Sequence, residues 1–427
     1  MTIEKLRLAD LRPAEYNPRK DLKPGDSEYE KLKRSIEQFG YVDLLIWNKT
    51  TGHIVGGHQR AKVMLDLGYD EVDCVVVEMD ETREKALNVA LNKINGDWDK
   101  DKLALVIADI QGSDFDVAFT GFDESEIADL FVETAKGEAH DDDFDTDTAL
   151  KEKPFVETGD VWTLGRHRLV CGDSTKAETF ETLMGGKRAN LCVTDPPYNC
   201  DYEGGTGMKI LNDKMSAEKF KAFLLAAFTG IFNALVDGGS FYAFHSDAEK
   251  VNFFEAAVEA GFHYSTTCVW VKNSLVIGRM DYQMRHEPVL YAFKDTAKHK
   301  WYSDRKQTTV WEFDRPTKSK LHPTMKPIPL IAYPIQNSSA PNGIVLDPFG
   351  GSGSTLIACE QTDRICFTSE LDPVYATVMV KRYIEQVGGS EGVSLVRDGL
   401  TYQFSEVPGV AAMSETTAGN KAGSDNG

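Results

Sequence analysis

The tetrapeptide Asp195-Pro196-Pro197-Tyr198 brings together residue types that could activate an amine. It follows residues 190–194, an apolar run that predicts a buried strand. The strand must end there, because a proline cannot donate a hydrogen bond to a sheet and its ring restricts φ. The Asp195 carboxylate is therefore expected at the carboxyl end of a strand, where open α/β sheets bind their ligands. An ordinary turn is the alternative for these four residues taken alone.

A carboxylate held in this way suits an amine whose lone pair is delocalised into an aromatic ring. Hydrogen bonds from the amine to Asp195 and to a carbonyl of the Pro196-Pro197 segment would localise the lone pair on the nitrogen. The nitrogen could then attack an electrophilic methyl group directly, without a covalent enzyme intermediate. Tyr198 offers a flat ring on which an aromatic base could stack.

A second motif, residues 346–355, reads LDPFGGSGST and lies between an apolar strand and an apolar helix. Its glycines allow positive φ and a close approach of a ligand to the backbone. Glu370 ends the next predicted strand, 23 residues after Asp347. That spacing suits a carboxylate that binds the ribose hydroxyls of an adenosine-containing ligand. The glycine pattern is not the G-x-G-x-x-G of dinucleotide binding, so no pyrophosphate need be invoked.

The elements that must position these motifs follow from hydrophobic periodicity. Short apolar runs alternate with helical patterns through residues 155–404, which predicts an α/β fold with a parallel sheet. A buried helix is expected over residues 217–236, where apolar side chains recur at i, i+3 and i+4. Strands are expected at residues 168–171, 190–194, 240–245, 265–271, 289–293, 343–346 and 364–368.

A chain of 427 residues is long enough for two or three domains. We expect one domain over residues 1–130 and a larger one over residues 155–404. Residues 131–154 are strongly acidic and nearly free of aliphatic side chains, which predicts a linker. Residues 405–427 are rich in Ser, Thr, Gly, Asn and Ala and are expected to be a disordered tail.

Composition excludes several classes of protein. The seven cysteines include no CxxC pair and lie mostly in apolar runs, so we expect neither a disulfide framework nor a zinc site, and we assign no metal. No apolar run of about 18 residues and no signal-peptide core is present, so we expect a cytoplasmic protein without a membrane partner. The formal net charge of −20 argues against attraction to nucleic acid through the surface as a whole.

Basic residues nevertheless gather locally. Residues 272–326 contain 12 Lys and Arg against 6 Asp and Glu. Aromatic residues lie among them: Trp301, Tyr302, Trp311 and Phe313. We expect DNA to bind here, and a solvated charged loop is the alternative.

The motifs together resemble those of the DNA amino-methyltransferases, in the permuted class whose catalytic motif precedes the cofactor motif. Residues 195–198 match the family's D/N/S-P-P-Y/F motif, and residues 347–353 match its F-x-G-x-G loop. Residues 321–327 resemble the H-P-T-x-K-P element, and residues 171–174 resemble the G-D element. The resemblance covers roughly residues 161–396, with the four motifs in the family's order.

This resemblance implies a Rossmann-like methyltransferase sheet that uses S-adenosyl-L-methionine to methylate a base flipped out of double-stranded DNA. Adenine N6 is favoured by the aspartate form of the tetrapeptide, and cytosine N4 is the alternative. The implied catalytic residues are Asp195, Pro196, Pro197 and Tyr198. The implied cofactor contacts are Asp173 to the adenine, His322, Thr324 and Lys326 around the methionine portion, and Asp347, Phe349, Gly351, Gly353, Ser354 and Glu370.

Target recognition in this class precedes the H-P-T-x-K-P element, which indicates residues 272–320. The candidate DNA contacts are Arg285, Lys300, Arg305, Lys306, Arg315 and Lys318. The sequence leaves open a homodimer, a cognate restriction enzyme and a phage or prophage origin. No Pro-Cys dipeptide occurs, so the covalent chemistry of cytosine-C5 enzymes is not expected.

The N-terminal domain contains Gly56-Gly57-His58-Gln59-Arg60 before a helical pattern, and Asn17-Pro18-Arg19 upstream. These segments resemble those of the ParB-like family, whose fold is α+β, although His58 and Gln59 replace the usual residues. The hypothesis is that this domain binds DNA or a nucleotide and assists the methyltransferase. The alternative from another functional class is a non-catalytic, ParB-like DNA-binding protein.

Overall fold

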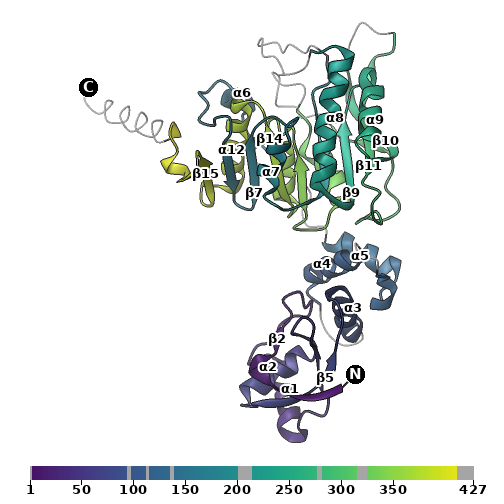
Figure 1. Cartoon of the computed structure of the whole chain (residues 1–427), viewed down its shortest axis with the longest axis vertical. Helices are drawn as coiled ribbons and strands as arrows, with labels where there is room; N and C mark the ends of the chain where they lie inside the picture. Colours follow the sequence, from purple (N-terminus) through teal and green to yellow (C-terminus); the bar gives the residue numbers. More distant parts are fainter. Residues whose placement is uncertain are drawn as a thin grey trace, which may run out of the picture. The chain divides into compact units, whose positions relative to one another are not determined.

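A computed structural model describes residues 2–93, 98–111, 115–134, 139–200, 214–276, 281–314 and 325–410. The chain divides into two compact units, residues 1–134 and residues 135–427, and each is considered by itself (Figure 1). Four predicted site residues lie outside the described ranges: His322, Thr324, Arg315 and Lys318. The part of the tail beyond residue 410 lies outside them as well. Within the described ranges, no helix combines the length and apolar character needed to cross a membrane.

The first unit has an α+β architecture. Its described strands form one sheet in the order β1-β5-β3-β4-β2. The strands are β1 (Thr2–Arg7), β2 (Arg12–Pro13), β3 (Leu45–Asn48), β4 (His53–Gly56) and β5 (Glu71–Val77). The helices are α1 (Ser27–Phe39), α2 (His58–Asp66), α3 (Glu81–Asn92), α4 (Lys100–Gln111) and α5 (Glu124–Thr134), with 3-10 turns η1 (Leu8–Asp10) and η2 (Val117–Thr120).

A buried carboxylate holds the first unit together. Glu84 on α3 is fully buried. Its carboxylate accepts hydrogen bonds from Tyr16 Oη at 2.8 Å, from Asn48 Nδ2 at 2.5 Å, and from the Thr51 hydroxyl, and it lies 2.9 Å from His53 Nδ1. A buried charge is tolerated only when neighbouring groups satisfy its hydrogen-bonding capacity. These neighbours satisfy that of Glu84, and they come from the segment before α1 and from the region of β3 and β4.

The second unit is an α/β sandwich around one mixed sheet, with described strands in the order β12-β10-β11-β9-β8-β13-β14-β7-β6-β15-β16. Its strands are β6 (Val161–Leu164), β7 (His167–Cys171), β8 (Ala189–Thr194), β9 (Leu235–Phe244), β10 (His263–Val276), β11 (Met284–Phe293), β12 (Val310–Glu312), β13 (Ile344–Asp347), β14 (Ile365–Glu370), β15 (Val393–Arg397) and β16 (Leu400–Gln403). Its helices are α6 (Thr146–Ala149), α7 (Ala177–Met184), α8 (Ala217–Ala234), α9 (Lys250–Glu259), α10 (Ile328–Ser338), α11 (Ser354–Gln361) and α12 (Pro373–Val387), with 3-10 turns η3 (Asp247–Glu249) and η4 (Phe404–Glu406).

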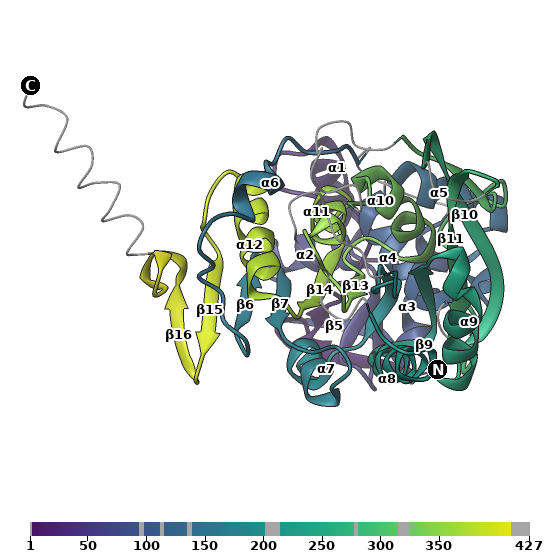
Figure 2. The ribbon, with the colours of Figure 1, turned by 90° about the horizontal axis from the view of Figure 1, so that it is seen from above.

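The central strands β9, β8, β13, β14 and β7 run parallel to one another, whereas β11 lies antiparallel between β9 and β10. Figure 2 shows α7, α8 and α9 on one face of this sheet and α10, α11 and α12 on the other. The α/β fold predicted from the sequence is confirmed, and each predicted strand overlaps an observed one. The predicted parallel arrangement holds for the central strands, but not for β11, which is antiparallel to both its neighbours. The predicted helix over residues 217–236 is α8, which ends at Ala234.

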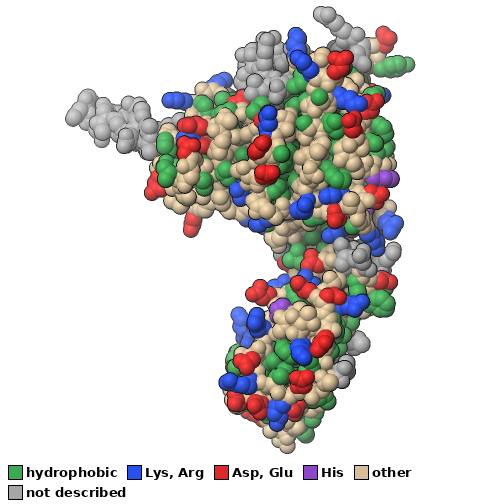
Figure 3. Space-filling view, in the orientation of Figure 1, with side chains coloured by type: hydrophobic (Ala, Val, Ile, Leu, Met, Phe, Trp, Pro, Cys, Tyr) green, Lys and Arg blue, Asp and Glu red, His purple; other side chains and the backbone are tan. Residues whose placement is uncertain are grey.

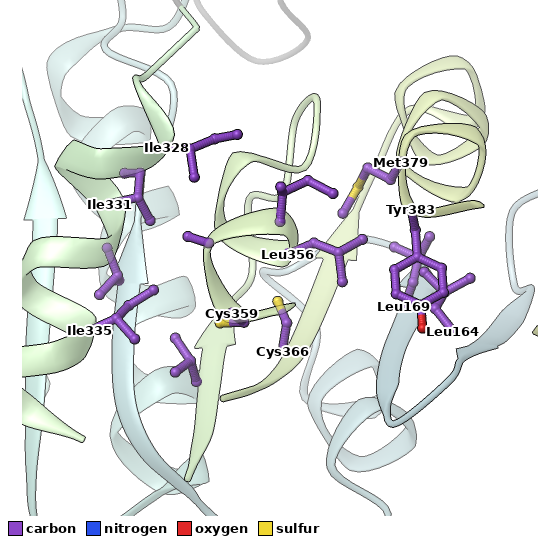
Figure 4. Packing of buried hydrophobic residues seen from close by; sticks show 14 of the residues in the cluster. Leu164, Leu169, Ile328, Ile331, Ile335, Leu356, Cys359, Cys366, Met379 and Tyr383 are labelled. Carbon is purple, nitrogen blue, oxygen red and sulfur yellow. The ribbon is translucent and has the colours of Figure 1, made fainter. Parts of the chain in front are cut away.

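Both faces of the sheet bury apolar side chains, as a parallel sheet requires. Figure 4 shows Ile331 and Ile335 of α10, Leu356 of α11 and Met379 of α12 turned towards the strands. Phenylalanines of α8 fill the opposite face. All seven cysteines are free; Cys74 is buried in the core of the first unit, and five others are buried in the second unit.

Replacing Glu84 by Gln tests the role of the buried carboxylate. The amide keeps the volume but presents an NH2 group to neighbours that are themselves donors. We expect the first unit to lose about 1–3 kcal/mol of its free energy of unfolding. Hydrogen exchange of residues 45–92 measures this loss. The matched control is Glu81→Gln on the same helix, where an exposed carboxylate pairs with Lys85 and its loss should have little effect.

Candidate active site

Asp195 lies at the carboxyl end of β8, as predicted, because the two prolines after it end the strand. Its side chain is 31% exposed. Tyr198 Oη donates a hydrogen bond of 2.5 Å to Asp195 Oδ1, and Lys326 Nζ donates one of 2.6 Å to Oδ2. The carboxylate is therefore held at both oxygens. Because each carboxylate oxygen can accept a further hydrogen bond, Asp195 can still receive one from an amine.

Lys326 and Glu287 extend this arrangement into a buried chain of alternating charges. Lys326 Nζ lies 3.2 Å from Glu287 Oε2 and 3.1 Å from Tyr198 Oη. Glu287 of β11 also forms an ion pair with Lys272 of the neighbouring strand β10. Lys272 and Lys326 are both almost completely buried. We call Lys272, Glu287, Lys326 and Asp195 the charge chain, whose two cations and two anions balance.

The charge chain fixes the protonation states at the site. Burial alone would raise the pKa of Glu287, but the ammonium groups of Lys326 and Lys272 outweigh it and hold the pKa at about 2. Burial alone would lower the pKa of Lys326, and the nearby Asp195 and Glu287 carboxylates raise it instead. Burial and the same two carboxylates raise the pKa of Tyr198 well above its usual value. Tyr198 is therefore a neutral hydrogen-bond donor, and Lys326 is a fixed cation.

The glycine loop, residues 348–353, follows β13 next to β8. A Cβ atom added at Gly350 would lie 2.4 Å from Thr368 Oγ1, so only glycine fits beside β14. Gly353 has φ of 88° and precedes the first turn of α11. Gly351 N donates a 2.8 Å hydrogen bond to Glu370 Oε2, which joins the loop to the end of β14.

Glu370 is the predicted ribose-binding carboxylate. Its Oε1 accepts a hydrogen bond of 2.9 Å from Asp372 N. Burial raises the pKa of Glu370 to about 7, although the backbone donors of Asp372 and Gly351 oppose this shift. The backbone carbonyl of Glu370 accepts from Gly172 N at 2.9 Å, which places the G-D element next to it. Glu370 is therefore surrounded by the loops that follow β7 and β13.

Two further predicted contacts have structural partners. Asp173 Oδ1 accepts hydrogen bonds from Thr175 N at 2.9 Å and from Thr175 Oγ1 at 2.8 Å. Asp347 is buried and accepts from Thr194 Oγ1 at 2.7 Å, a contact that ties β13 to β8. Burial raises the pKa of Asp347 to about 6, against the hydrogen bonds it receives. Asp347 thus joins the catalytic strand end to the glycine loop, which also contains Phe349.

These groups fit an adenosine-containing cofactor. A Cβ atom built at Gly351 meets nothing within 4 Å, so there is open space above the loop. Carboxylates suited to ribose hydroxyls and to adenine donors border the loop at Glu370 and Asp173. Ser354, the first residue of α11 after the glycine loop, donates a 3.0 Å hydrogen bond from Oγ to the Lys326 carbonyl, which joins this end of the loop to the charge chain. Lys326, predicted near the methionine portion, points its ammonium group at Asp195.

The predicted DNA contacts are divided between two edges of the sheet. Arg285 is exposed at the start of β11, near Glu287, and its Nε donates to the Lys272 carbonyl at 3.1 Å. Residues Lys300, Arg305 and Lys306 follow the other end of β11. There Lys294 N donates a hydrogen bond to the carbonyl of Gly239 in β9, and Tyr302 N donates one to the carbonyl of Asn337 at the end of α10. We call the side of the sheet at which β8 ends, and where Asp195 lies, the catalytic edge. The structure does not bring these three residues to the catalytic edge.

Part of the local basic excess lies inside the protein. Lys272, Lys294 and Lys326 are buried, and so are Tyr302 and Trp311. Trp311 packs edge-on against Tyr333 of α10, which is a core contact. Figure 3 shows Lys and Arg side chains interspersed with Asp and Glu on the visible face of the molecule. The surface charge of the predicted target-recognition segment is therefore smaller than its composition indicates.

Glu287 and Lys272 were missed by the sequence analysis. One signal was available, because Glu287 is an acid two positions before the apolar strand residues 289–293. An acidic side chain is unusual beside a buried strand, and it is normally paired with a cation when it is buried. The identity of the partner could not be read from the sequence, since Lys326 lies 39 positions after Glu287 and no local pattern links the two residues.

Three separate segments of the chain match known protein families. Residues 189–381 match the N6/N4 family described as DNA methylase. Residues 101–158 match the ParB-methyltransferase HTH domain, and residues 1–93 match the ParB N-terminal domain.

Individual relatives are distant. The chain is 24% identical over 249 residues to the Type II methyltransferase M.HpaI of Haemophilus parainfluenzae, which covers 53% of this chain and 77% of the relative. It is 26% identical over 226 residues to the DNA adenine methyltransferase YhdJ of Escherichia coli (strain K12), which covers 45% of this chain and 75% of the relative. The solved M1.HpyAVI–SAM complex has 22% identity and a TM-score of 0.38, covering 50% of this chain and 97% of its own.

The charge chain predicts the behaviour of Glu287→Gln. Two buried lysines would then face the single carboxylate of Asp195, so Lys326 would no longer be held in place. We expect kcat to fall at least about tenfold, with a lower Tm because an uncompensated buried charge is strongly destabilising. The matched variant Lys272→Met/Glu287→Gln removes a cation and an anion together. The double variant should recover the Tm of the wild type, while its kcat stays low because Lys326 has still lost Glu287. Recovery of kcat together with Tm would argue against a positioning role for Glu287.

The raised pKa of Glu370 predicts a pH dependence of cofactor binding. The side chain is ionised above pH 7 and accepts hydrogen bonds from hydroxyl groups best in that state. Lowering the pH from 8 to 6 should therefore weaken S-adenosyl-L-methionine binding about tenfold. Calorimetric titration measures this change. Glu370→Gln should bind weakly and without this slope, and an equal slope in the variant would assign the titration to another group.

Proposed function

This chain belongs to the N6/N4 family of DNA methyltransferases and carries ParB-type N-terminal domains, and we propose that it methylates adenine N6 in double-stranded DNA. The observation that carries the proposal is the Asp195 carboxylate, fixed by Lys326 and Tyr198 next to the glycine loop. The aspartate form of the motif favours adenine over cytosine N4. The name of the relative YhdJ, a DNA adenine methyltransferase, supports the same choice.

The proposed mechanism begins with the orientation of the amine. Asp195 accepts a hydrogen bond from the exocyclic amine, and a carbonyl of the Pro196-Pro197 segment accepts the second. The nitrogen is thereby drawn towards tetrahedral geometry, and its lone pair points away from the base. S-adenosyl-L-methionine supplies the electrophilic methyl group when it is bound at the glycine loop. Asp195, which is partly exposed, is placed to take the proton that the methylated amine gives up and to pass it to water.

Lys326 and Tyr198 keep Asp195 ready for this role. A carboxylate that already has two fixed donors does not need to reorganise when the base arrives, and such preorganisation lowers the barrier. Lys326 Nζ lies 5.3 Å from the centre of the Tyr198 ring, which fixes the ring as well. We propose that the flipped base stacks on this ring. Glu287 offsets the positive charge of Lys326, which would otherwise oppose the charge that develops on the methylated amine.

DNA recognition is proposed for two parts of the chain. Arg285 lies at the catalytic edge, where it can reach a phosphate near the flipped base. The N-terminal region, residues 1–158, matches ParB-type and helix-turn-helix families and is proposed to add DNA affinity. This division would explain how a chain with a net charge of −20 binds DNA, because the attraction is local.

Modified-base sequencing tests the proposed function. DNA from cells that express the wild type should carry N6-methyladenine at one recognition sequence, and DNA from cells that express Asp195→Ala should not. The purified variant should still bind S-adenosyl-L-methionine, while its methylation rate falls at least about a hundredfold. N4-methylcytosine at the site would replace adenine by cytosine as the substrate. Equal methylation by the variant would remove Asp195 from the catalytic role.

A further inference from the structure

The acidic segment expected to be a linker is attached to the catalytic unit. We call residues 139–152 the acidic strap. Its short helix α6 lies beside α12 (Figure 2), and Ala149 and Leu150 pack against Val378 of that helix. His140 and Gln361 of α11 exchange hydrogen bonds of 2.9 and 3.2 Å. The strap therefore runs along α11, which follows the glycine loop, and α12, which follows the strand that ends at Glu370.

Asp142 neutralises a buried arginine beneath the glycine loop. Arg382 of α12 is only 2% exposed. Its Nε and Nη2 atoms donate to the two carboxylate oxygens of Asp142 at 2.6 and 3.0 Å. Its Nη1 donates to the carbonyl of Ser352, inside the loop, at 3.0 Å. A buried guanidinium needs an anionic partner, so Asp142 is what allows Arg382 to remain under the loop.

Asp141 binds the start of α10, the helix that begins two residues after Lys326. Its Oδ1 accepts a hydrogen bond of 2.8 Å from Ile328 N, at the first residue of α10. Backbone N–H groups in the first turn of a helix have no partner within the helix, so an outside carboxylate stabilises this turn. Lys326, whose ammonium group holds Asp195, lies two residues earlier. Asp141 thus fixes the chain segment from which Lys326 reaches the catalytic carboxylate.

We propose that Asp141 and Asp142 of the acidic strap are positioning residues for methyl transfer. Asp142 sets the glycine loop through Arg382, and Asp141 sets Lys326 through the start of α10. The inference rests on the proposed function for the identity of the reaction, but not on which base is methylated. It also places the start of the catalytic domain at the strap rather than at residue 155.

The chain offers a matched control on the same strap. Glu152 forms an ion pair with Lys381, the neighbour of Arg382 on α12. Neither residue of this pair contacts the glycine loop in the described structure. Glu152→Gln therefore removes one charge and one attachment of the strap, as Asp142→Asn does, but leaves Arg382 and Ser352 untouched.

Calorimetric titration of the full-length variants with S-adenosyl-L-methionine tests Asp142. Asp142→Asn should raise Kd at least about tenfold, whereas Glu152→Gln should stay within about twofold of the wild type. If Asp142→Asn does not fold, Asp142→Asn/Arg382→Met removes both buried charges and takes its place. This double variant should still bind weakly, because the Ser352 carbonyl has lost its donor. Wild-type affinity in the folded variant, or equal losses in Asp142→Asn and Glu152→Gln, would overturn the proposal for Asp142.

Asp141→Ala tests the second half of the proposal. It should lower kcat several-fold while leaving Kd for S-adenosyl-L-methionine near the wild-type value, because Lys326 acts on Asp195. An unchanged kcat would overturn the role of Asp141. Failure of the proposed function gives a different result, since cofactor binding would then depend on Asp142 in a protein that methylates neither adenine nor cytosine in DNA.

Discussion

The ion pair between Lys326 and Asp195 is the interaction on which the site depends. It joins the end of β8 to the segment before α10. Through the hydrogen bond from Ser354 to the Lys326 carbonyl, it also connects residues 195–198 to the helix that follows the glycine loop. A lysine this deeply buried stays charged only when anions surround it. Glu287 meets that need, and Lys272 in turn compensates Glu287. The result is a neutral cluster that holds one partly exposed carboxylate in a fixed orientation.

The sheet makes this arrangement possible. Strands β7, β8, β13 and β14 run parallel, so residues that end them meet at one edge although they are up to 200 residues apart in sequence. Asp347 and Thr194 connect two of these ends, and Gly172 and Glu370 connect another two. The order of the motifs along the chain has little influence on the site, because the edge gathers them in space.

The sequence was sufficient for features that rest on local pattern. Periodicity and spacing predict seven strands of the second unit, the long helix α8, and the strand-end positions of Asp195 and Glu370. They did not predict β6, β12, β15 and β16. Tertiary pairing could not be predicted in the same way. Composition alone suggests that Lys272 and Lys326 contribute to the surface charge, but the fold buries both side chains. The acidic strap resembles a linker because it has few aliphatic residues, yet its carboxylates bind Arg382, Lys381 and the start of α10.

The central claim is that the fixed Asp195 carboxylate receives the target amine. The most direct test is a crystal structure of the full chain with a non-reactive analogue of S-adenosyl-L-methionine and duplex DNA that contains its recognition sequence. The account predicts an extrahelical adenine whose amine lies within hydrogen-bonding distance of Asp195, with Lys326 still paired to the carboxylate and Tyr198 against the base. An amine bound elsewhere, or a Lys326 that replaces Asp195 as the contact to the base, would contradict it.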